Sequence, residues 1–296
     1  MSPRFLSGLL GLIAAPALCG CGPSASTTSL PKIHVKGSDT MIAAAAAWAE
    51  TYDRAKVEVG GGGSGIGISE LVRGTIDIAT TSRPMTNEEA VAAKTSSGKD
   101  PISYVVGYDG VAVYVHRENP VDEISMEDLA AIFGAGGRID RWSLVGAQVT
   151  GCGSDRIVPV IRNVQSGTHE SFAKAVLGKG GRFRTECIVT LGSRDLVTLI
   201  ENVPCAIGFS GMSFQTDRVK VLRLKTAGGQ SCLPSAGTVR SGCYPIARPL
   251  LLYSLGDPER PVRDFIDWIR SDAGQGILEA IGEVPLAPIE RSGAGS

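Results

Sequence analysis

Hydrophobic and polar positions along this chain fall into two alternating patterns. Short runs rich in β-branched residues, such as Lys32–Lys36 and Ile157–Ile161, are typical of strands. Between them lie segments with apolar residues three and four positions apart, of which Val262–Arg270 is the clearest, and the alanine-rich segment Met41–Arg54 has high helix propensity. Strands alternate with helices in this way through most of the chain. This order predicts an α/β protein whose parallel or mixed sheet carries helices on both faces.

The middle of the chain contains two apolar, β-branched runs, Ile102–Gly107 and Val111–His116. We expect two strands here, with Tyr108-Asp109-Gly110 as the turn between them. The chain has 296 residues and contains no internal repeat or long linker after its first thirty positions. This length is large for one sheet, so two α/β lobes fit better.

Four loops of glycine and hydroxyl residues follow predicted strands. Gly37–Thr40, Gly63–Gly67 and Ser166–Thr168 each precede a predicted helix, and Thr80–Arg83 ends a strand. Ligands of open α/β sheets bind at the carboxyl ends of strands, and helix starts offer free N–H groups to anions. The strand before Ser166–Thr168 also ends in Arg162. If the loops converge, they predict a pocket for a small oxyanion, lined by neutral donors and one or two arginines.

Two other interpretations of these loops, as nucleotide-binding loops and as the catalytic site of a hydrolase, are less well supported. The glycine run lacks the Gly-Lys-Ser/Thr sequence of a phosphate-binding P-loop, and no GxGxxG is followed by a well-placed acid. An exported hydrolase would need Ser166 and His169 as nucleophile and base, and their spacing would let them meet. The GxSxG motif is missing, however. We therefore expect a binding protein and no enzyme.

The N-terminus predicts export. Arg4 precedes a short apolar run and the sequence Leu18-Cys19-Gly20-Cys21, which resembles a bacterial lipobox. The apolar run is too short to span a membrane. We expect residues 1–21 to be a lipoprotein signal peptide, Cys21 to be the lipidated residue, and residues 22–31 to form a flexible tether. The alternative is plain signal cleavage without a lipid. In both cases the mature protein works outside the cytoplasm.

Charge and cysteine content narrow the function further. The net charge is −1 and 20% of residues are charged, which does not suggest a nucleic-acid-binding surface. The cysteines after position 21 have no CxxC or histidine spacing, so we expect no metal and no cofactor. In an oxidising compartment we expect disulfides. We expect a disulfide between Cys232 and Cys243 first, and one between Cys152 and Cys187 second. We expect Cys205 to be a small buried hydrophobic residue.

Six sequence segments occur in an order that resembles one known family. They are GSDTM, AWAETY, GGGGSGIG, DIATTSRPM, RNVQSGTHESF and AIGF, and they cover nearly all of the mature chain. In these six segments the chain resembles the periplasmic phosphate-binding proteins of bacterial phosphate ABC transporters. The resemblance implies a type II periplasmic-binding-protein fold, in which two lobes close like a hinge over one phosphate ion. Lobe I would comprise residues 32–115 plus 243–296, and lobe II residues 116–242.

The resemblance also implies a set of phosphate-binding residues, carried over by motif position. They are Thr40, the Met41 amide, Ser64, Ser82, Arg162, Ser166, Gly167 and Thr168. Some family members have Asp at the position of Ser82, where the carboxylate accepts a hydrogen bond from protonated phosphate and discriminates against sulfate. Asp109 is our preferred candidate for that proton acceptor here, and Asp39 is the other. A turn or capping role is the alternative for both.

These features together predict a lipid-anchored, monomeric protein outside the cytoplasm that binds inorganic phosphate and delivers it to an ABC permease. The lipid anchor would be its only contact with the membrane, and no nucleic acid is expected as a partner. Three alternatives remain open. They are a binding protein for another tetrahedral oxyanion such as sulfate or molybdate, a phosphate sensor, and an exported hydrolase.

Overall fold

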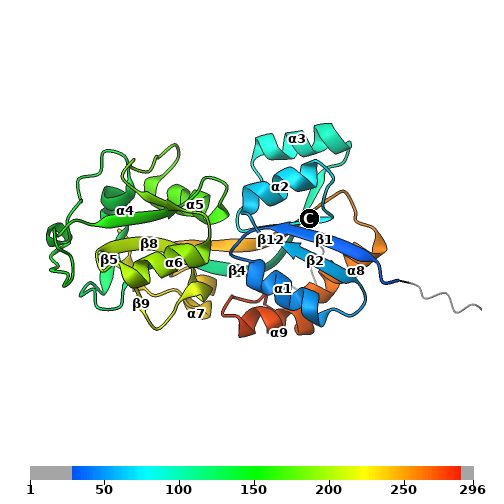
Figure 1. The fold of residues 1–296 in the computed structure, drawn as a ribbon. Coiled ribbons are helices and arrows are strands. Elements are labelled where there is room, and N and C mark those ends of the chain that lie inside the picture. The colour runs from blue at the N-terminus through cyan, green and yellow to red at the C-terminus, as the bar shows by residue number, and fades with distance from the viewer. Residues whose placement is uncertain (1–28, 288–296) are drawn as a thin grey trace, which may run out of the picture.

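The structure, a computed structural model, describes residues 29–287 and has two α/β lobes side by side (Figure 1). The predicted signal peptide, Cys21 and most of the tether lie outside the described residues. A nine-stranded mixed sheet runs through both lobes in the order β2-β1-β3-β12-β4-β8-β6-β7, with β9 paired to β4. The predicted α/β class with helices on both faces is confirmed. Within residues 29–287, no helix is long and apolar enough to cross a membrane.

Lobe I holds the first half of this sheet. Its strands are β1 (Lys32–Gly37), β2 (Lys56–Gly60), β3 (Ile78–Thr81), β12 (Ala247–Leu255) and the first part of β4 (Pro101–His116). The helices are α1 (Ile42–Thr51), α2 (Ser64–Val72), α3 (Asn87–Ser97), α8 (Arg260–Arg270) and α9 (Asp272–Ala280). Figure 1 shows α2 and α3 above the sheet and α1, α8 and α9 below it. Trp48 and Phe265 belong to the core on one face, and Leu71 and Tyr253 to the core on the other.

Lobe II continues the sheet. Its strands are β8 (Ala206–Gly211), β6 (Val158–Arg162), β7 (Ile188–Thr190) and β9 (Val219–Val221), with a small separate sheet of β5 (Glu123–Ser125), β10 (Arg223–Lys225) and β11 (Ser231–Cys232). The helices are α4 (Met126–Phe133), α5 (Gly167–Phe172), α6 (Ser193–Asn202) and α7 (Ala236–Arg240), with the helical turns η1 (Trp142–Val145), η2 (Ala173–Leu177) and η3 (Met212–Phe214). Side chains of β4 alternate between the two cores of this lobe: Val111 and Val113 pack in one, Ala112 and Tyr114 in the other.

Strand β4 joins the lobes, and here one sequence prediction is wrong. Tyr108-Asp109-Gly110 is not a turn, because residues Pro101 to His116 form one continuous strand. The part up to Gly110 pairs with β12, and Val111 to Val115 pair with β8. The backbone of Asp109 lies opposite Arg248, so β12 supplies the hydrogen-bonding neighbour that would be missing from a turn. Residues 111–115, which we expected in lobe I, pair with β8 and pack in the cores that β8 shares.

The structure contains two disulfides among the described residues. Cys232 is joined to Cys243 as expected, but Cys152 is joined to Cys205 and not to Cys187, which is free and buried. The expectation that Cys205 is only a buried hydrophobic residue is therefore wrong. Strands β6 and β8 are parallel neighbours, so the loops that precede them meet, and the Cα atoms of Cys152 and Cys205 are 5.3 Å apart. That neighbourhood depends on strand order, which spacing along the chain does not reveal.

Candidate functional site

Three serine hydroxyls converge at one edge of the lobe I sheet. Ser38 follows β1, Ser82 follows β3, and Ser64 begins α2. Ser38 Oγ donates to Ser82 Oγ at 3.2 Å, and the Ser82 amide donates to Ser64 Oγ at 3.1 Å. All three residues are buried. The carboxyl ends of these parallel strands thus gather hydroxyl groups in one place, as the sequence predicts.

Lobe II presents a matching loop at the end of β6. Ser166 is the N-cap of α5, and its Oγ accepts hydrogen bonds from the amides of Thr168 (3.2 Å) and His169 (3.4 Å). A serine hydroxyl that accepts in this way still has its own O–H to donate. Ser166, Gly167 and Thr168 are all buried.

The two loops face each other across the lobes. Thr40 Oγ1 lies 3.2 Å from Thr168 Oγ1, and the amide of Gly65 donates to the Gln165 carbonyl at 3.0 Å. Gly167 packs so closely that a Cβ atom there would lie 2.5 Å from Ser64 Oγ and 2.6 Å from Ser82 Oγ. Six of the eight expected binding residues, namely Thr40, Ser64, Ser82, Ser166, Gly167 and Thr168, therefore lie together. The Met41 amide differs, because it donates to the Ser38 carbonyl at 3.1 Å while its side chain belongs to the core.

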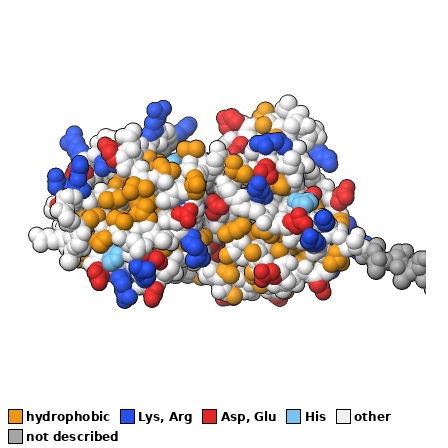
Figure 2. Space-filling model, viewed as in Figure 1, with side chains coloured by type: hydrophobic (Ala, Val, Ile, Leu, Met, Phe, Trp, Pro, Cys, Tyr) orange, Lys and Arg blue, Asp and Glu red, His pale blue; other side chains and the backbone are white. Residues whose placement is uncertain are grey.

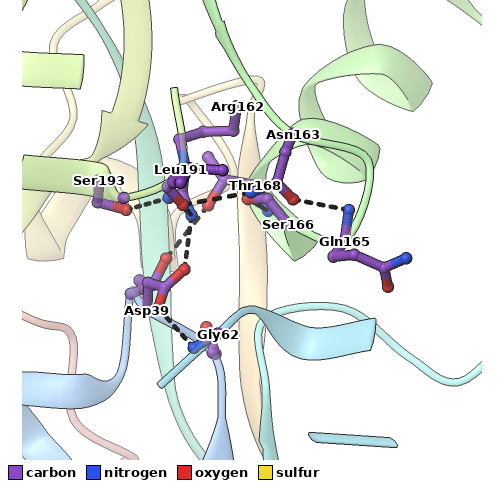
Figure 3. A network of polar contacts seen from close by, with 12 residues as sticks. Asp39, Gly62, Arg162, Asn163, Gln165, Ser166, Thr168, Leu191 and Ser193 are labelled. Atoms are coloured by element: carbon purple, nitrogen blue, oxygen red, sulfur yellow. Dashed lines mark hydrogen bonds and ion pairs between the residues drawn. The ribbon is translucent and has the colours of Figure 1, made fainter. Parts of the chain in front are cut away.

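Arg162, at the end of β6, extends from lobe II to lobe I (Figure 3). Its Nη2 lies 2.6 Å from Asp39 Oδ2 and also donates to the Leu191 carbonyl at 2.7 Å. Its Nη1 donates to Ser193 Oγ at 2.5 Å. Asp39 is held in turn by the Gly62 amide, which donates to Oδ1 at 2.9 Å. Arg162 is only 1% exposed, and its Nε has no hydrogen-bond partner within residues 29–287. The Nε–H of this buried guanidinium is thus available to a ligand.

A second buried arginine, Arg248 on β12, was missed by the sequence analysis. Its Nη1 donates to Ser82 Oγ at 3.1 Å and its Nη2 to Thr40 Oγ1 at 3.0 Å. The same guanidinium donates to Asp109 Oδ2 from Nε at 3.0 Å and from Nη2 at 2.7 Å. The available signal was one cation at the start of the apolar strand ARPLLLY. Its significance depends on the register between β12 and β4.

The two guanidiniums give the site its electrostatic character. Burial lowers the pKa of Arg162, the nearby charge of Asp39 raises it, and the positive charge of Arg248 lowers it further. Arginine nevertheless remains protonated in proteins. Two mutually repelling cations removed from water are stabilised by an anion placed between the lobes.

Asp109 was expected to accept a proton from the ligand, but its oxygens have other partners. Oδ2 accepts the two hydrogen bonds from Arg248, and Oδ1 accepts one from the Met212 amide at 3.1 Å. The residue is fully buried. These contacts favour a role in orienting Arg248 over direct contact with a ligand proton. Asp39, the other candidate, is bonded to Arg162 as described above.

Ser166 and His169 do not form a nucleophile and base pair. His169 Nδ1 lies 2.7 Å from the Arg162 carbonyl oxygen, and the ring packs against Phe183 with centroids 4.6 Å apart. Burial lowers the pKa of His169. Ser166 Oγ makes its hydrogen bonds to the backbone of α5. In the described part of the chain, no group of three His, Cys, Asp or Glu residues could hold a metal ion.

An inter-lobe cleft of about 580 Å³ lies beside this polar cluster. Arg83 and Glu170 line it from opposite lobes, and Arg83 Nε is 2.6 Å from Glu170 Oε2. Arg83 is also fixed within lobe I by Glu89, at 2.7 Å. Figure 2 shows basic and acidic side chains interspersed over both lobes on this face, with no broad area of one sign.

Comparison with known proteins identifies the class to which this architecture belongs. The model of the PBP superfamily domain matches residues 22–273. A candidate phosphate ABC transporter substrate-binding protein from Clostridium perfringens, solved with bound phosphate, has the same fold, with a TM-score of 0.76, 24% identity, and coverage of 86% of this chain and 100% of that one. The fold is that of a type II periplasmic binding protein.

Two further relatives define the family. The phosphate-binding protein PstS of Pseudomonas aeruginosa is 30% identical over 266 residues, which cover 84% of this chain and 81% of that protein. An ABC-type phosphate transport receptor from Vibrio cholerae is 26% identical, with a TM-score of 0.69 and coverage of 86% of this chain and 100% of that one. The chain therefore belongs to the PBP superfamily and, within it, to the PstS family of phosphate-binding proteins.

Proposed function

We propose that this protein binds inorganic phosphate outside the cytoplasm and delivers it to an ABC permease. One observation carries the proposal: buried hydroxyls from both lobes meet beside two buried arginines, in a chain of the PstS family. Hydroxyl donors and guanidiniums replace the hydration of a tetrahedral anion, and burial between lobes strengthens each of these interactions. The process is binding and release, with no chemical turnover.

The ligand set we propose combines the residues of both lobes. Lobe I contributes Thr40, Ser64 and Ser82. Met41, the N-cap residue of α1, is left out of the set. Lobe II contributes Arg162, Ser166, Gly167 and Thr168. Arg248 joins this set because it already donates to two of the lobe I hydroxyls. Asp109 would then act on the ligand through Arg248.

Lobe closure is the proposed mechanical step. Strands β4 and β12 cross between the lobes, and rotation about them would separate the facing hydroxyls. The ion pairs Arg162–Asp39 and Arg83–Glu170 would form only in the closed arrangement. A permease could therefore distinguish loaded from empty protein by the relative position of the lobes.

The location and assembly follow from the sequence prediction. We propose that the protein works in the periplasm or at the cell surface as a monomer, attached to the membrane only through a lipid on Cys21. The tether would let the lobes reach a permease in the same membrane. Mass spectrometry of the membrane fraction tests the anchor: a diacylglyceryl mass on an N-terminal Cys21 peptide is expected, and an unmodified N-terminus downstream of it contradicts the proposal.

Calorimetry with phosphate, sulfate and molybdate tests the ligand directly. Saturable binding with one site and preference for phosphate is expected. Heat with sulfate or molybdate and none with phosphate would reassign the protein to another oxyanion. A hydrolase is disfavoured because His169 Nδ1 pairs with the Arg162 carbonyl oxygen and not with Ser166. Release of phosphate from phosphate esters by the purified protein would reverse that conclusion.

A further inference from the structure

Near Asp109 and Arg248 lies another buried ionisable group, Glu283, that the proposed ligand set leaves unexplained. Glu283 follows α9, and its residue is 3% exposed. Its neighbour Val284 exchanges backbone hydrogen bonds with Tyr108 at 2.8 and 2.9 Å, which fixes Glu283 beside β4 next to Asp109. Ser213 of lobe II donates to Glu283 Oε1 at 2.7 Å. Glu283 Oε2 is buried and accepts no hydrogen bond from the residues that the structure describes.

Around Glu283 the negative charges outnumber the positive ones if every group is ionised. Asp109 and Glu283 are both carboxyl groups, and Arg248 is the single cation between them and the anion site. The groups that face Glu283 are Asp109 and Tyr114 on β4, Arg248 on β12 and the Ser213 hydroxyl. Of these, only Arg248 is positive. Two adjacent carboxylates removed from water cannot both remain charged without a second cation.

We propose that Glu283 carries a proton beside the Asp109–Arg248 pair, and that this neutral Glu283 is a positioning residue that keeps Arg248 directed at the anion. The inference rests on the proposed function. With the proton on Glu283, Asp109 is the sole counter-ion of Arg248 and receives two of its hydrogen bonds. The other side of the guanidinium remains on Thr40 and Ser82. An ionised Glu283 would add negative charge behind the site and draw the guanidinium away from the two hydroxyls.

The protonation of Glu283 predicts how the stability of the protein changes with pH. Burial, followed by the negative charge of Asp109, raises the pKa of Glu283 well above its ordinary value. In the unfolded chain this pKa returns to about 4.3. At a pH between the unfolded pKa of about 4.3 and the raised pKa of the folded state, the folded protein binds one more proton than the unfolded chain. The contribution of Glu283 to stability is therefore complete below about pH 4.3 and falls as the pH rises through this window.

The first experiment follows melting temperature from about pH 4 to pH 8 for the wild type, Glu283→Gln and Glu279→Gln, without phosphate. Glu279 is exposed on α9 and serves as the matched control. We expect the wild type to lose stability relative to Glu283→Gln as the pH rises, and to remain parallel to Glu279→Gln. A wild-type profile parallel to that of Glu283→Gln overturns the proposal that Glu283 carries a proton. If Glu283→Gln does not fold, Asp109→Asn replaces it, because removing the neighbouring charge should flatten the same slope.

The second experiment measures phosphate binding by calorimetry at neutral pH. Glu283→Gln, which mimics the neutral acid, should bind within about 2-fold of the wild type, whereas Glu283→Ala should bind roughly 10-fold more weakly, as for other residues that orient a ligand-binding group. Equal losses in both variants, or no loss in either, overturn the positioning role. If the wild type itself binds no phosphate, the proposed function fails, while the melting profiles still decide whether Glu283 carries a proton.

Discussion

Arg162 Nη2 lies 2.6 Å from Asp39 Oδ2, and the two residues belong to opposite lobes. The guanidinium is almost completely buried, whereas the carboxylate keeps partial contact with solvent. Asp39 thus compensates part of the charge that Arg162 brings into the interior. An anion is the group that would use Arg162 Nε–H, which has no partner within residues 29–287, together with the paired hydroxyls of Thr40 and Thr168.

Arg162→Ala should weaken phosphate binding by at least about 100-fold. Each charge-assisted hydrogen bond contributes about 1.5–3 kcal/mol, and a tenfold change in affinity corresponds to about 1.4 kcal/mol. Calorimetry measures the change. Arg156→Ala, which removes an exposed arginine paired with Asp140 at 3.4 Å in the same lobe, is the control and should bind normally. An Arg162→Ala dissociation constant within about 3-fold of the wild type would remove Arg162 from the site.

Arg248→Gln should weaken phosphate binding by roughly 10- to 100-fold, because it removes one of the two positive charges of the proposed ligand set. Asp109 would also lose its counter-ion, so the melting temperature should fall together with the affinity. The matched control is Arg263→Gln, since Arg263 is half-exposed on α8 and pairs with Asp257. Unchanged phosphate affinity in Arg248→Gln would mean that this arginine only neutralises Asp109.

Gly167→Ala should prevent full closure of the lobes. The added Cβ would meet Ser64 Oγ and Ser82 Oγ at 2.5 and 2.6 Å, which is well inside normal contact distance. We expect at least a 10-fold loss of phosphate affinity and, with phosphate present, a larger radius of gyration in small-angle scattering. Gly153→Ala is the control, because a Cβ there meets no atom within 4 Å. Wild-type affinity and compaction in Gly167→Ala would show that the lobes do not approach as described.

The two disulfides should differ in their effect on stability. Cys152–Cys205 closes a loop of 53 residues and Cys232–Cys243 one of 11. In the chain-entropy model, their loss costs about 4 and about 3 kcal/mol of unfolding free energy, respectively. Urea denaturation of Cys152→Ser/Cys205→Ser and Cys232→Ser/Cys243→Ser measures both. A larger loss from the second pair would indicate that local packing outweighs loop length.

The parts of the site that sequence predicts are those encoded by neighbouring residues. Ser64 and Ser166 stand in strand–loop–helix segments, where turn glycines, hydroxyls and the following helix are all visible within about ten residues. Thr40, Gly167 and Thr168 also lie in such segments, Ser82 follows a strand, and these six residues meet in the structure. The parallel sheet brings the loops together because their strands end at the same edge.

The missed features depend on contacts between distant segments. Arg248 reaches the site because β12 lies opposite β4 in one register, and Asp109 belongs to a continuous strand because β12 is there to pair with it. Cys205 meets Cys152 because β8 lies beside β6. Glu283 gains its buried position from the bridge between Val284 and Tyr108. No local pattern of hydrophobic and polar residues records any of these pairings.

A crystal structure of the protein grown with phosphate tests the central claim most directly. We predict one phosphate ion between the lobes, with its oxygens contacted by the guanidiniums of Arg162 and Arg248 and by hydroxyls from both lobes. The distance between Thr40 Oγ1 and Thr168 Oγ1 should then be set by the ion that separates them. Closed lobes with phosphate bound elsewhere, or contacted by neither arginine, would contradict the account.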